Sequence, residues 1–334
     1  DEIQCEEIAK KLTDCFKKSF ELSTESVHIT SSIGISIFPR DGDGIDDLLK
    51  HADAAMYQAK AEGRNRYHFF TKTLSQRLRQ QRSIAARLRE SLKKDEFELL
   101  FQPQIDVKTG KFTSCEALLR WRPLDEESAV PPNIFIPIAE RSELIADIGR
   151  WVLEKTCQQS KKWKQKGIGV RIDINVSGKE LEKSSFFERL TACRSHYGLS
   201  PEDIGLELTE NVLIKSDNAI LENLRAQRDL GVEISIDDFG TGYSSLSYLK
   251  QFPVSHLKID RSFLKGAPEN AYDSALMEAI VNVGHKLDLK IVVEGVETQS
   301  QSDYCKSLNV EFIQGFLYSK PISAEAIEAL LEKQ

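Results

Sequence analysis

From Glu96 to the end of the chain, short apolar runs alternate with longer segments of helical periodicity. The short runs are rich in Val, Ile, Leu and Phe, which is typical of strands. Eight of them are predicted as strands: Phe97–Phe101, Ser114–Trp121, Val170–Asn175, Ile204–Leu208, Val232–Asp237, His256–Ile259, Lys290–Glu294 and Glu311–Gly315. Strands separated by helices pair in parallel, and eight of them over about 240 residues favour an α/β barrel of the TIM type over an open sheet.

The segments between most of these strands carry helical patterns, of which the clearest are Ile145–Lys166, Asn218–Leu230 and Asp273–Leu287. The first two strands are the exception. Only a short segment separates them, and its sequence Val107-Lys-Thr-Gly110 reads as a hairpin turn. We therefore expect one strand of the barrel to run antiparallel to its neighbours.

The first part of the chain has a different pattern. Residues Glu6 to Phe20 predict an amphipathic helix, with Ile8, Leu12, Phe16 and Phe20 on one stripe. The elements expected after it are a half-buried strand over Val27–Phe38, a turn over Pro39–Gly44, a helix over Ile45–Ala61 that closes at Gly63, and a short strand over Gly63–Phe70.

A basic helix is predicted over Leu74–Lys94, between these two regions. Leu74, Leu78, Ala85, Leu88 and Leu92 lie near helical spacing among Arg and Lys residues. Two interpretations stay open at this point. The segment is either a stiff inter-domain helix that transmits a signal or a helix with an ordinary solvated basic face.

Composition narrows the possible partners. The chain of 334 residues is 40% hydrophobic and carries 45 basic and 52 acidic residues, a net charge of −7. This balance argues against binding of duplex nucleic acid and leaves room for a small phosphate-bearing ligand. Six cysteines without a C-x-x-C pair indicate reduced thiols and a cytoplasmic location.

The sequence contains no apolar run of the roughly 18 residues that a membrane helix needs, and no secretory signal pattern. It opens at Asp1 in what reads as the middle of a helix. We therefore expect a fragment of a longer protein, which could be anchored to a membrane through other segments.

The pair Asp237–Asp238 is the most informative chemical feature. It ends a β-branched strand and leads into the loop Phe239–Leu249, which is rich in Gly, Ser and Thr. Adjacent carboxylates repel each other and are costly to desolvate together. At a buried strand end, a bound cation would stabilise such a pair by neutralising its charge. The alternative is a capping Asp beside a solvated turn Asp.

Polar residues recur at the ends of the other predicted strands too. They are Gln102, Glu116 with Arg120, Asn175, Glu207 with Glu210, Lys258 with Asp260, Glu294 with Glu297, and Gln314. Each could be a helix cap, but in a barrel the loops after the strands converge on one rim, which carries the active site. Oxygen ligands without clustered His or Cys indicate Mg²⁺ or Mn²⁺ rather than zinc. Two such ions, about 3.5–4 Å apart, would suit a phosphodiester displacement, with Asp237 between them.

A series of motifs in order gives the region from Glu96 onward a close resemblance to EAL-domain cyclic-di-GMP phosphodiesterases. They are Gln102-Pro-Gln104, Glu116-Ala-Leu-Leu-Arg120, Asn175-Val-Ser177, Glu207-Leu-Thr-Glu210, Asp237-Asp-Phe-Gly-Thr-Gly242, Lys258-Ile-Asp260, Glu294-Gly-Val-Glu297 and Gln314-Gly-Phe316. The first 70 or so residues resemble the end of a GGDEF diguanylate cyclase domain. That resemblance rests on Thr30–Ser36, His51–Lys60 and Gly63–Tyr67. The GG(D/E)EF segment is not in this sequence, so cyclase activity is not expected of these residues.

The EAL resemblance implies a role for each matching residue. The implied ligands of a first metal ion are Glu116, Asn175, Glu207 and Asp237, while Asp237 and Asp238 would hold a second. Lys258 would contact the nucleophilic water, and Glu294 would be a ligand or general base. The implied contacts to the cyclic dinucleotide are Gln102, Leu118, Arg120 and Gln314, and Glu210 and Glu297 would support the loop after Asp238.

These expectations divide the chain into a GGDEF fragment (1–72), a linker helix (73–94) and an EAL barrel (95–334). The predicted activity is metal-dependent hydrolysis of cyclic di-GMP to linear pGpG in bacterial signalling. The resemblance also implies a homodimer formed through the barrel. The alternative function is a catalytically silent receptor for cyclic di-GMP that acts through a protein partner. A barrel glycosidase with two carboxylates would explain neither Asn175 nor Lys258.

Overall fold

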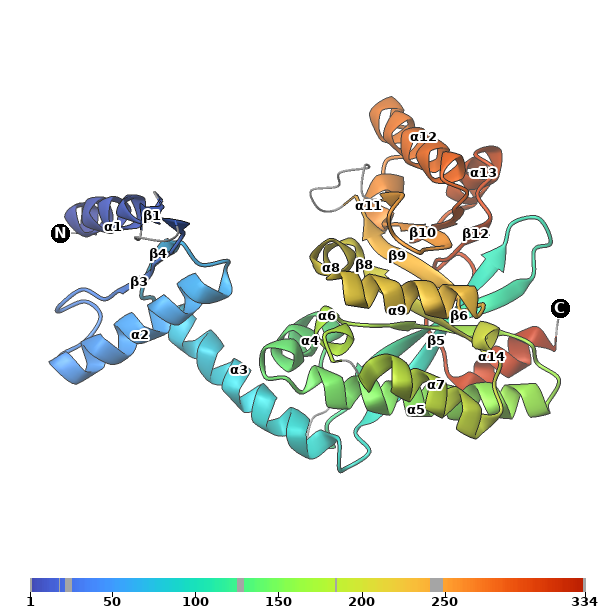
Figure 1. Cartoon of the computed structure of the whole chain (residues 1–334), viewed down its shortest axis with the longest axis horizontal. Helices are drawn as coiled ribbons and strands as arrows, with labels where there is room; N and C mark the ends of the chain where they lie inside the picture. Colours follow the sequence, from blue (N-terminus) through green and yellow to red (C-terminus); the bar gives the residue numbers. More distant parts are fainter. Residues whose placement is uncertain are drawn as a thin grey trace. The chain divides into compact units, whose positions relative to one another are not determined.

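The computed structural model describes residues 2–17, 19–21, 26–124, 129–183, 185–240 and 249–332 (Figure 1). The chain divides into two compact units, Asp1–Arg87 and Leu88–Gln334. In the described part of the chain, no helix has both the length and the apolar composition needed to cross a membrane. The residue bounds of the three predicted segments stay a prediction.

The first unit is a small α/β arrangement. Its elements are α1 (Glu2–Cys15), β1 (Phe20–Glu21), β2 (Ser26–Val27), β3 (Ser32–Ile35), α2 (Ile45–Ala61), β4 (Arg66–Phe69) and most of α3 (Lys72–Ser91). β3 and β4 pair in parallel, and β1 pairs with β2 in antiparallel fashion. The helix predicted over Ile45–Ala61 is confirmed at both ends.

Two predictions for this unit are wrong. The first helix ends at Cys15, so Phe20 lies in β1 and not on a helical stripe. Ala9 and Thr13 are the buried residues of α1, whereas Ile8 is 58% and Leu12 48% exposed. Apolar periodicity identifies a helix but not the face that packs. The strand predicted over 27–38 is likewise broken into β2 and β3.

The basic helix α3 is confirmed, although it ends three residues before the predicted Lys94. Leu74 and Leu78 pack against Ala55 and Phe70 in the first unit. In the second unit, the indole nitrogen of Trp121 donates a hydrogen bond of 2.8 Å to the Ser91 hydroxyl. The two ends of α3 are therefore fixed by different cores.

Within the described residues of the second unit, eight strands close into a barrel, as predicted. The strands are β5 (Phe97–Asp106), β6 (Phe112–Trp121), β7 (Arg171–Asn175), β8 (Ile204–Thr209), β9 (Ile234–Phe239), β10 (His256–Ile259), β11 (Lys290–Val293) and β12 (Phe312–Ile313). Their order around the barrel is β10-β11-β12-β5-β6-β7-β8-β9. β5 is antiparallel to both β6 and β12, and the other neighbours are parallel, which confirms the single reversed strand.

Helices follow most of the parallel strands and cover the outside of the barrel (Figure 1). They are α4 (Pro132–Arg141), α5 (Ile145–Gln165), α6 (Gly178–Leu181), α7 (Ser185–Tyr197), α8 (Glu210–Lys215), α9 (Asn218–Asp229), α11 (Arg261–Leu264), α12 (Ala271–Lys286), α13 (Gln299–Ser307) and α14 (Ala324–Leu331), with a 3₁₀ turn at Pro201–Asp203. Cys157 on α5 and Cys305 on α13 are buried free thiols.

The inside of the barrel holds a buried ion pair as well as apolar side chains. Arg171 and Asp173 of β7 form two parallel hydrogen bonds, of 2.7 Å from Nε and 3.0 Å from Nη2. On the neighbouring strand, a Cβ atom at Gly205 would lie 2.0 Å from the Asp173 carboxylate. A side chain at this position would collide with the pair, so the glycine provides its space.

β9 contains a bulge at the two adjacent aspartates. Leu257 pairs with Ile236 and Ile259 with Phe239, so β9 carries one more residue than β10 across this step. Asp238 accommodates the extra residue with a left-handed backbone, φ 53°. In a regular strand Asp237 and Asp238 would point to opposite faces; a bulge changes the direction of one side chain.

Candidate active site

Lys258 is at the centre of a buried acidic cluster inside the barrel. Its side chain is completely buried, and its ammonium nitrogen lies near carboxylates from four other strands or strand ends. The Nζ–oxygen distances are 2.7 Å to Glu207, 2.7 Å to Glu294, 3.3 Å to Asp237 and 3.5 Å to Glu116. The structure therefore brings together four of the predicted acidic residues around the predicted lysine.

Amide side chains hold one of these carboxylates in place. Asn175 donates a hydrogen bond of 2.7 Å to Oε1 of Glu116, and Gln314 donates one of 2.8 Å to Oε2. Gln314 also donates to the side-chain oxygen of Gln102 at 3.1 Å. Two of the residues expected to contact substrate thus lie beside the predicted metal ligand Glu116.

The cluster contains more negative charge than one lysine can balance. Burial raises the pKa of Glu207 well above its ordinary value, although Lys258 opposes this effect. Burial likewise raises the pKa of Glu294 to about 8, again against Lys258; its side chain keeps 21% exposure, so water moderates the effect. Glu116 behaves differently: burial would raise its pKa, but Lys258 and the amide donors of Gln314 and Asn175 outweigh burial and lower it. The site therefore favours further positive charge.

The oxygen atoms of the cluster fit a hard divalent cation. Oε1 of Glu207 is buried without a hydrogen-bond partner, and Oδ1 of Asp237 accepts no hydrogen bond but lies 3.3 Å from the Lys258 ammonium, so both oxygens have lone pairs available. Carboxylate and amide oxygens are the ligands that Mg²⁺ and Mn²⁺ prefer. As they stand, no three His, Cys, Asp or Glu side chains in the described ranges are arranged to hold a metal ion; the Lys258 ammonium takes the central position.

Asp238 lies at the exposed edge of the cluster, next to the bulge. Burial of its carboxyl group and the neighbouring charge of Asp237 raise its pKa. The loop predicted to couple metal binding to dimer contacts, Phe239–Leu249, falls largely on residues 241–248, outside the described part of the chain. The prediction that Glu210 and Glu297 support this loop stays a prediction.

The remaining predicted residues lie near the cluster in sequence. Leu118 and Arg120 are half-buried in β6, and Arg120 donates to the Leu119 carbonyl at 2.9 Å. Glu210 is the buried first residue of α8, and Glu297 is exposed before α13. Asp260 caps α11 by accepting a 3.0 Å hydrogen bond from the Ser262 amide. For this residue, the alternative interpretation as a helix cap is therefore right.

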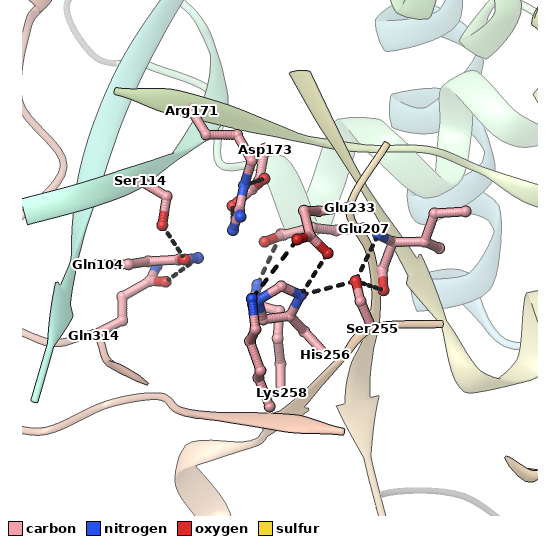
Figure 2. A network of polar contacts seen from close by, with 12 residues as sticks. Gln104, Ser114, Arg171, Asp173, Glu207, Glu233, Ser255, His256, Lys258 and Gln314 are labelled. Atoms are coloured by element: carbon pink, nitrogen blue, oxygen red, sulfur yellow. Dashed lines mark hydrogen bonds and ion pairs between the residues drawn. The ribbon is translucent and has the colours of Figure 1, made fainter. Parts of the chain in front are cut away.

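The structure also corrects where some of these residues lie on their strands. β5 continues five residues past the predicted end at Phe101, so Gln102 lies within the strand, and Glu116 lies in the middle of β6. Gln104 and Ser114, for which the sequence predicted no role, extend the network of Gln314 (Figure 2). The available signal was the alternation of Gln102 and Gln104, which puts both on one face of a strand.

Family models match both parts of the chain. The model described as EAL domain matches residues 85–321, and the model described as Diguanylate cyclase, GGDEF domain matches residues 1–66. The bifunctional diguanylate cyclase/cyclic di-GMP phosphodiesterase MucR of Pseudomonas aeruginosa is 38% identical over 323 residues, 96% of this chain and 47% of MucR. The cyclic di-GMP phosphodiesterase PdeR of Escherichia coli is 34% identical over 97% of this chain and 49% of its own. The chain thus spans about half the length of these curated relatives.

Solved structures match the barrel as well. The PaMucR phosphodiesterase in complex with c-di-GMP has a TM-score of 0.69 and 37% identity over 73% of this chain and 99% of that one. The EAL enzyme Bd1971 in its cAMP- and cyclic-di-GMP-bound form has a TM-score of 0.72 and 30% identity, over 88% of this chain and 77% of that one.

Proposed function

Because the chain belongs to the EAL domain family over residues 85–321 and carries part of a GGDEF domain before it, we propose that its barrel hydrolyses one phosphodiester bond of cyclic di-GMP to give linear pGpG, with the help of divalent cations. The resemblance to both families that the motifs indicated is confirmed by these matches. The similar proteins MucR and PdeR are named as cyclic-di-GMP phosphodiesterases, which supports the choice of substrate.

The observation that carries the proposal is the buried cluster of Glu116, Glu207, Asp237 and Glu294 around Lys258. A barrel that needed these residues only for stability would lose little by replacing them with apolar side chains, since several buried like charges are costly. Their convergence inside the barrel is typical of a site that handles charge during a reaction.

The residues that would hold a first cation are Glu116, Asn175, Glu207 and Asp237, and Asp237 with Asp238 would hold a second. When bound, such cations lower the pKa of water and neutralise charge on phosphoryl oxygens. The buried oxygens of Glu207 and Asp237 that accept no hydrogen bond support this assignment. The bulge in β9 supports the use of both aspartates, since it frees them from pointing to opposite faces.

Lys258 and Glu294 would handle the attacking water. Their side chains are 2.7 Å apart, so each fixes the position of the other. A carboxyl group whose pKa is raised to about 8 can hold or accept a proton near neutral pH, as a general base requires. The ammonium of Lys258 would hold the water oxygen by donating a hydrogen bond to it.

The substrate would be held next to the acidic cluster by Gln102, Leu118, Arg120 and Gln314. Arg120 has a planar guanidinium suited to a phosphate and lies half-buried four residues after Glu116 on β6. Gln102 and Gln314 already contact each other at 3.1 Å; Gln102 keeps one N–H for a guanine or a phosphate, and the Gln314 carbonyl keeps one lone pair for a guanine.

The test is product analysis by ion-exchange chromatography after incubation of the protein with cyclic di-GMP and Mg²⁺ or Mn²⁺. We expect pGpG as the product, none of it in the presence of EDTA, and a loss of at least about a hundredfold in rate for Asp237→Asn. The control is Lys265→Met, which removes a charge at an exposed position directly after α11. Full activity of Asp237→Asn at saturating metal would contradict the assignment.

The alternative function, a silent receptor for cyclic di-GMP, is not favoured because the acidic cluster is complete. It predicts binding of cyclic di-GMP with no product at saturating Mg²⁺ and Mn²⁺, so the same assay decides between the two. We also propose a homodimer formed through the barrel. Sedimentation velocity across a range of protein concentrations tests this, and a single monomeric species at the highest concentration would exclude it.

A further inference from the structure

A chain of buried hydrogen bonds leads from Glu116 in the acidic cluster into the barrel wall, and Figure 2 shows the part formed by Gln314, Gln104 and Ser114. The Ser114 hydroxyl donates to Oε1 of Gln104 at 2.8 Å, and Nε2 of Gln104 donates to Oε1 of Gln314 at 3.2 Å. Nε2 of Gln314 then donates to Glu116 at 2.8 Å and to Gln102 at 3.1 Å. Each amide in this chain accepts on one side and donates on the other.

The hairpin of β5 and β6 provides the geometry for this chain. Gln104 lies directly opposite Ser114, and Gln102 lies directly opposite Glu116, on adjacent pairs of one face. Gln314 follows β12, which pairs with β5 on its other side. Its amide therefore reaches both polar pairs from the neighbouring strand.

The direction of the chain is set by chemistry. A carboxylate only accepts hydrogen bonds, so the amino end of Gln314 must face Glu116 and its carbonyl end must face Gln104. The carbonyl end of Gln314 then requires a donor, and Gln104 can provide one only if its own carbonyl faces Ser114. The Ser114 hydroxyl completes the chain as a donor, because it rotates to suit its partner.

Burial makes the donor of Gln104 difficult to replace. Gln104 and Ser114 are each 1% exposed and Gln314 is 3% exposed, so bulk water does not reach the three side chains. A buried carbonyl that loses its donor bears the full cost of desolvation. Gln314 would then regain a partner only by rotating, and rotation would point its oxygen at the Glu116 carboxylate.

We propose that Gln104 is a positioning residue: it fixes which end of the Gln314 amide faces Glu116 and the substrate, and Ser114 fixes Gln104 in turn. The inference rests on the proposed function for its effect on turnover, but its structural content is independent of that function. Gln104 would thus be needed for turnover although it contacts neither the proposed metal ligands nor the proposed substrate.

Three substitutions separate the contributions. Gln104→Glu replaces the donor with a second acceptor opposite the Gln314 carbonyl, Gln104→Met removes the donor at similar volume, and Ser114→Ala removes only the last donor. We expect kcat/KM for cyclic di-GMP to fall about 100-fold, about 10-fold and less than about threefold, respectively, in the range found for residues that orient an active-site ligand. Gln299→Met, on the exposed surface of α13, is the matched control.

A double-mutant cycle distinguishes positioning from a general structural effect. If Gln104 acts through Gln314, then Gln104→Met should have no further effect on kcat/KM, within about twofold, in a Gln314→Met background. Additive losses in the double variant would overturn the proposal, because Gln104 would then act independently of Gln314. Thermal unfolding of each variant identifies any that fails to fold. Ser114→Ala is the mildest change and keeps the test open if Gln104→Glu unfolds.

A second measurement does not depend on activity. In NMR spectra of the full chain, the side-chain amide signals of Gln314 can be assigned by their disappearance in Gln314→Met. We expect slow exchange of these protons with water in the native protein, and exchange at least about tenfold faster in Gln104→Met. Unchanged exchange in that variant would overturn the proposal. If the native protein shows no hydrolysis while the exchange changes as expected, the proposed function fails and the positioning role stands.

Discussion

Two charged clusters lie inside the same barrel, and they differ in how their charges are balanced; Figure 2 shows the Arg171–Asp173 pair and, of the other cluster, Lys258 with Glu207. The Arg171–Asp173 pair is one to one, with both carboxylate oxygens accepting hydrogen bonds from one guanidinium. The Lys258 cluster has four carboxylates around one ammonium, and buried oxygens of Glu207 and Asp237 accept no hydrogen bond. A satisfied pair can serve stability alone, whereas an unbalanced cluster costs stability and indicates a site for ligands.

The largest effect is expected from removing Lys258, which among the described residues is the only cation in the unbalanced cluster. Lys258→Met should reduce turnover of cyclic di-GMP about 1000-fold, since the water loses a group that orients it. In EDTA it should also lower the free energy of unfolding, because four carboxylates would then lie together without a counter-charge. Steady-state kinetics and urea unfolding measure the two effects, with Lys265→Met as the control. Near-native turnover of Lys258→Met would remove the distinction between the clusters.

Breaking the balanced Arg171–Asp173 pair should lower stability and leave turnover nearly unchanged. We expect Arg171→Met to lower the free energy of unfolding by about 3–5 kcal/mol, because Asp173 keeps a buried charge without a partner, while turnover of the folded protein stays within about threefold. The double variant Arg171→Met with Asp173→Leu should recover most of the stability. A large loss of turnover in that stable double variant would show that the pair also serves the reaction.

Divalent cations should stabilise the native protein through the unbalanced cluster only. At a hundredfold excess over the dissociation constant, Mn²⁺ should raise the free energy of unfolding by about 2.7 kcal/mol per site. Differential scanning fluorimetry should show the increase in Tm in the native protein and in Arg171→Met, and a smaller one in Asp237→Asn. Equal shifts in all three would place cation binding elsewhere.

The smallest effect concerns His256, which lies two residues before Lys258 on β10 and is completely buried. Burial, with the nearby charge of Arg171, lowers its pKa to about 3. In the unfolded chain a histidine has an ordinary pKa near 6.5, so as the pH falls the unfolded chain binds a proton before the folded protein does. The contribution of His256 to the free energy of unfolding is therefore fully present above about pH 6.5 and is lost as the pH decreases toward 3.

We therefore expect His256→Gln to remove about 1.4 kcal/mol of the stability difference between roughly pH 7.5 and pH 5.5. Urea unfolding at the two pH values measures this, and His196→Gln, at an exposed position on α7, is the control. Because only the difference between variant and native protein is compared, the carboxyl groups that titrate in the same range cancel. An unchanged pH dependence would show that His256 does not carry it.

Much of the barrel followed from local patterns. Strand and helix alternation from Glu96 onward predicted the closed barrel, and the turn at 107–110 predicted the reversed strand. The first unit was predicted less well, because the apolar stripe of Ile8 and Leu12 proved exposed and the strand over 27–38 is broken. Periodicity reports an amphipathic element but not its neighbour or its exact end.

The sequence alone determined the residue types of the site and their order: acidic and amide residues on successive strands, and a lysine between the apolar residues Leu257 and Ile259. Tertiary structure decided which of them meet. It placed Lys258 among four carboxylates, assigned Asp260 to a helix cap and added Gln104 and Ser114 to the network. The physical reason is that strand alternation fixes the face of a side chain, whereas barrel closure, register and the bulge at Asp237–Asp238 fix its height and its partners.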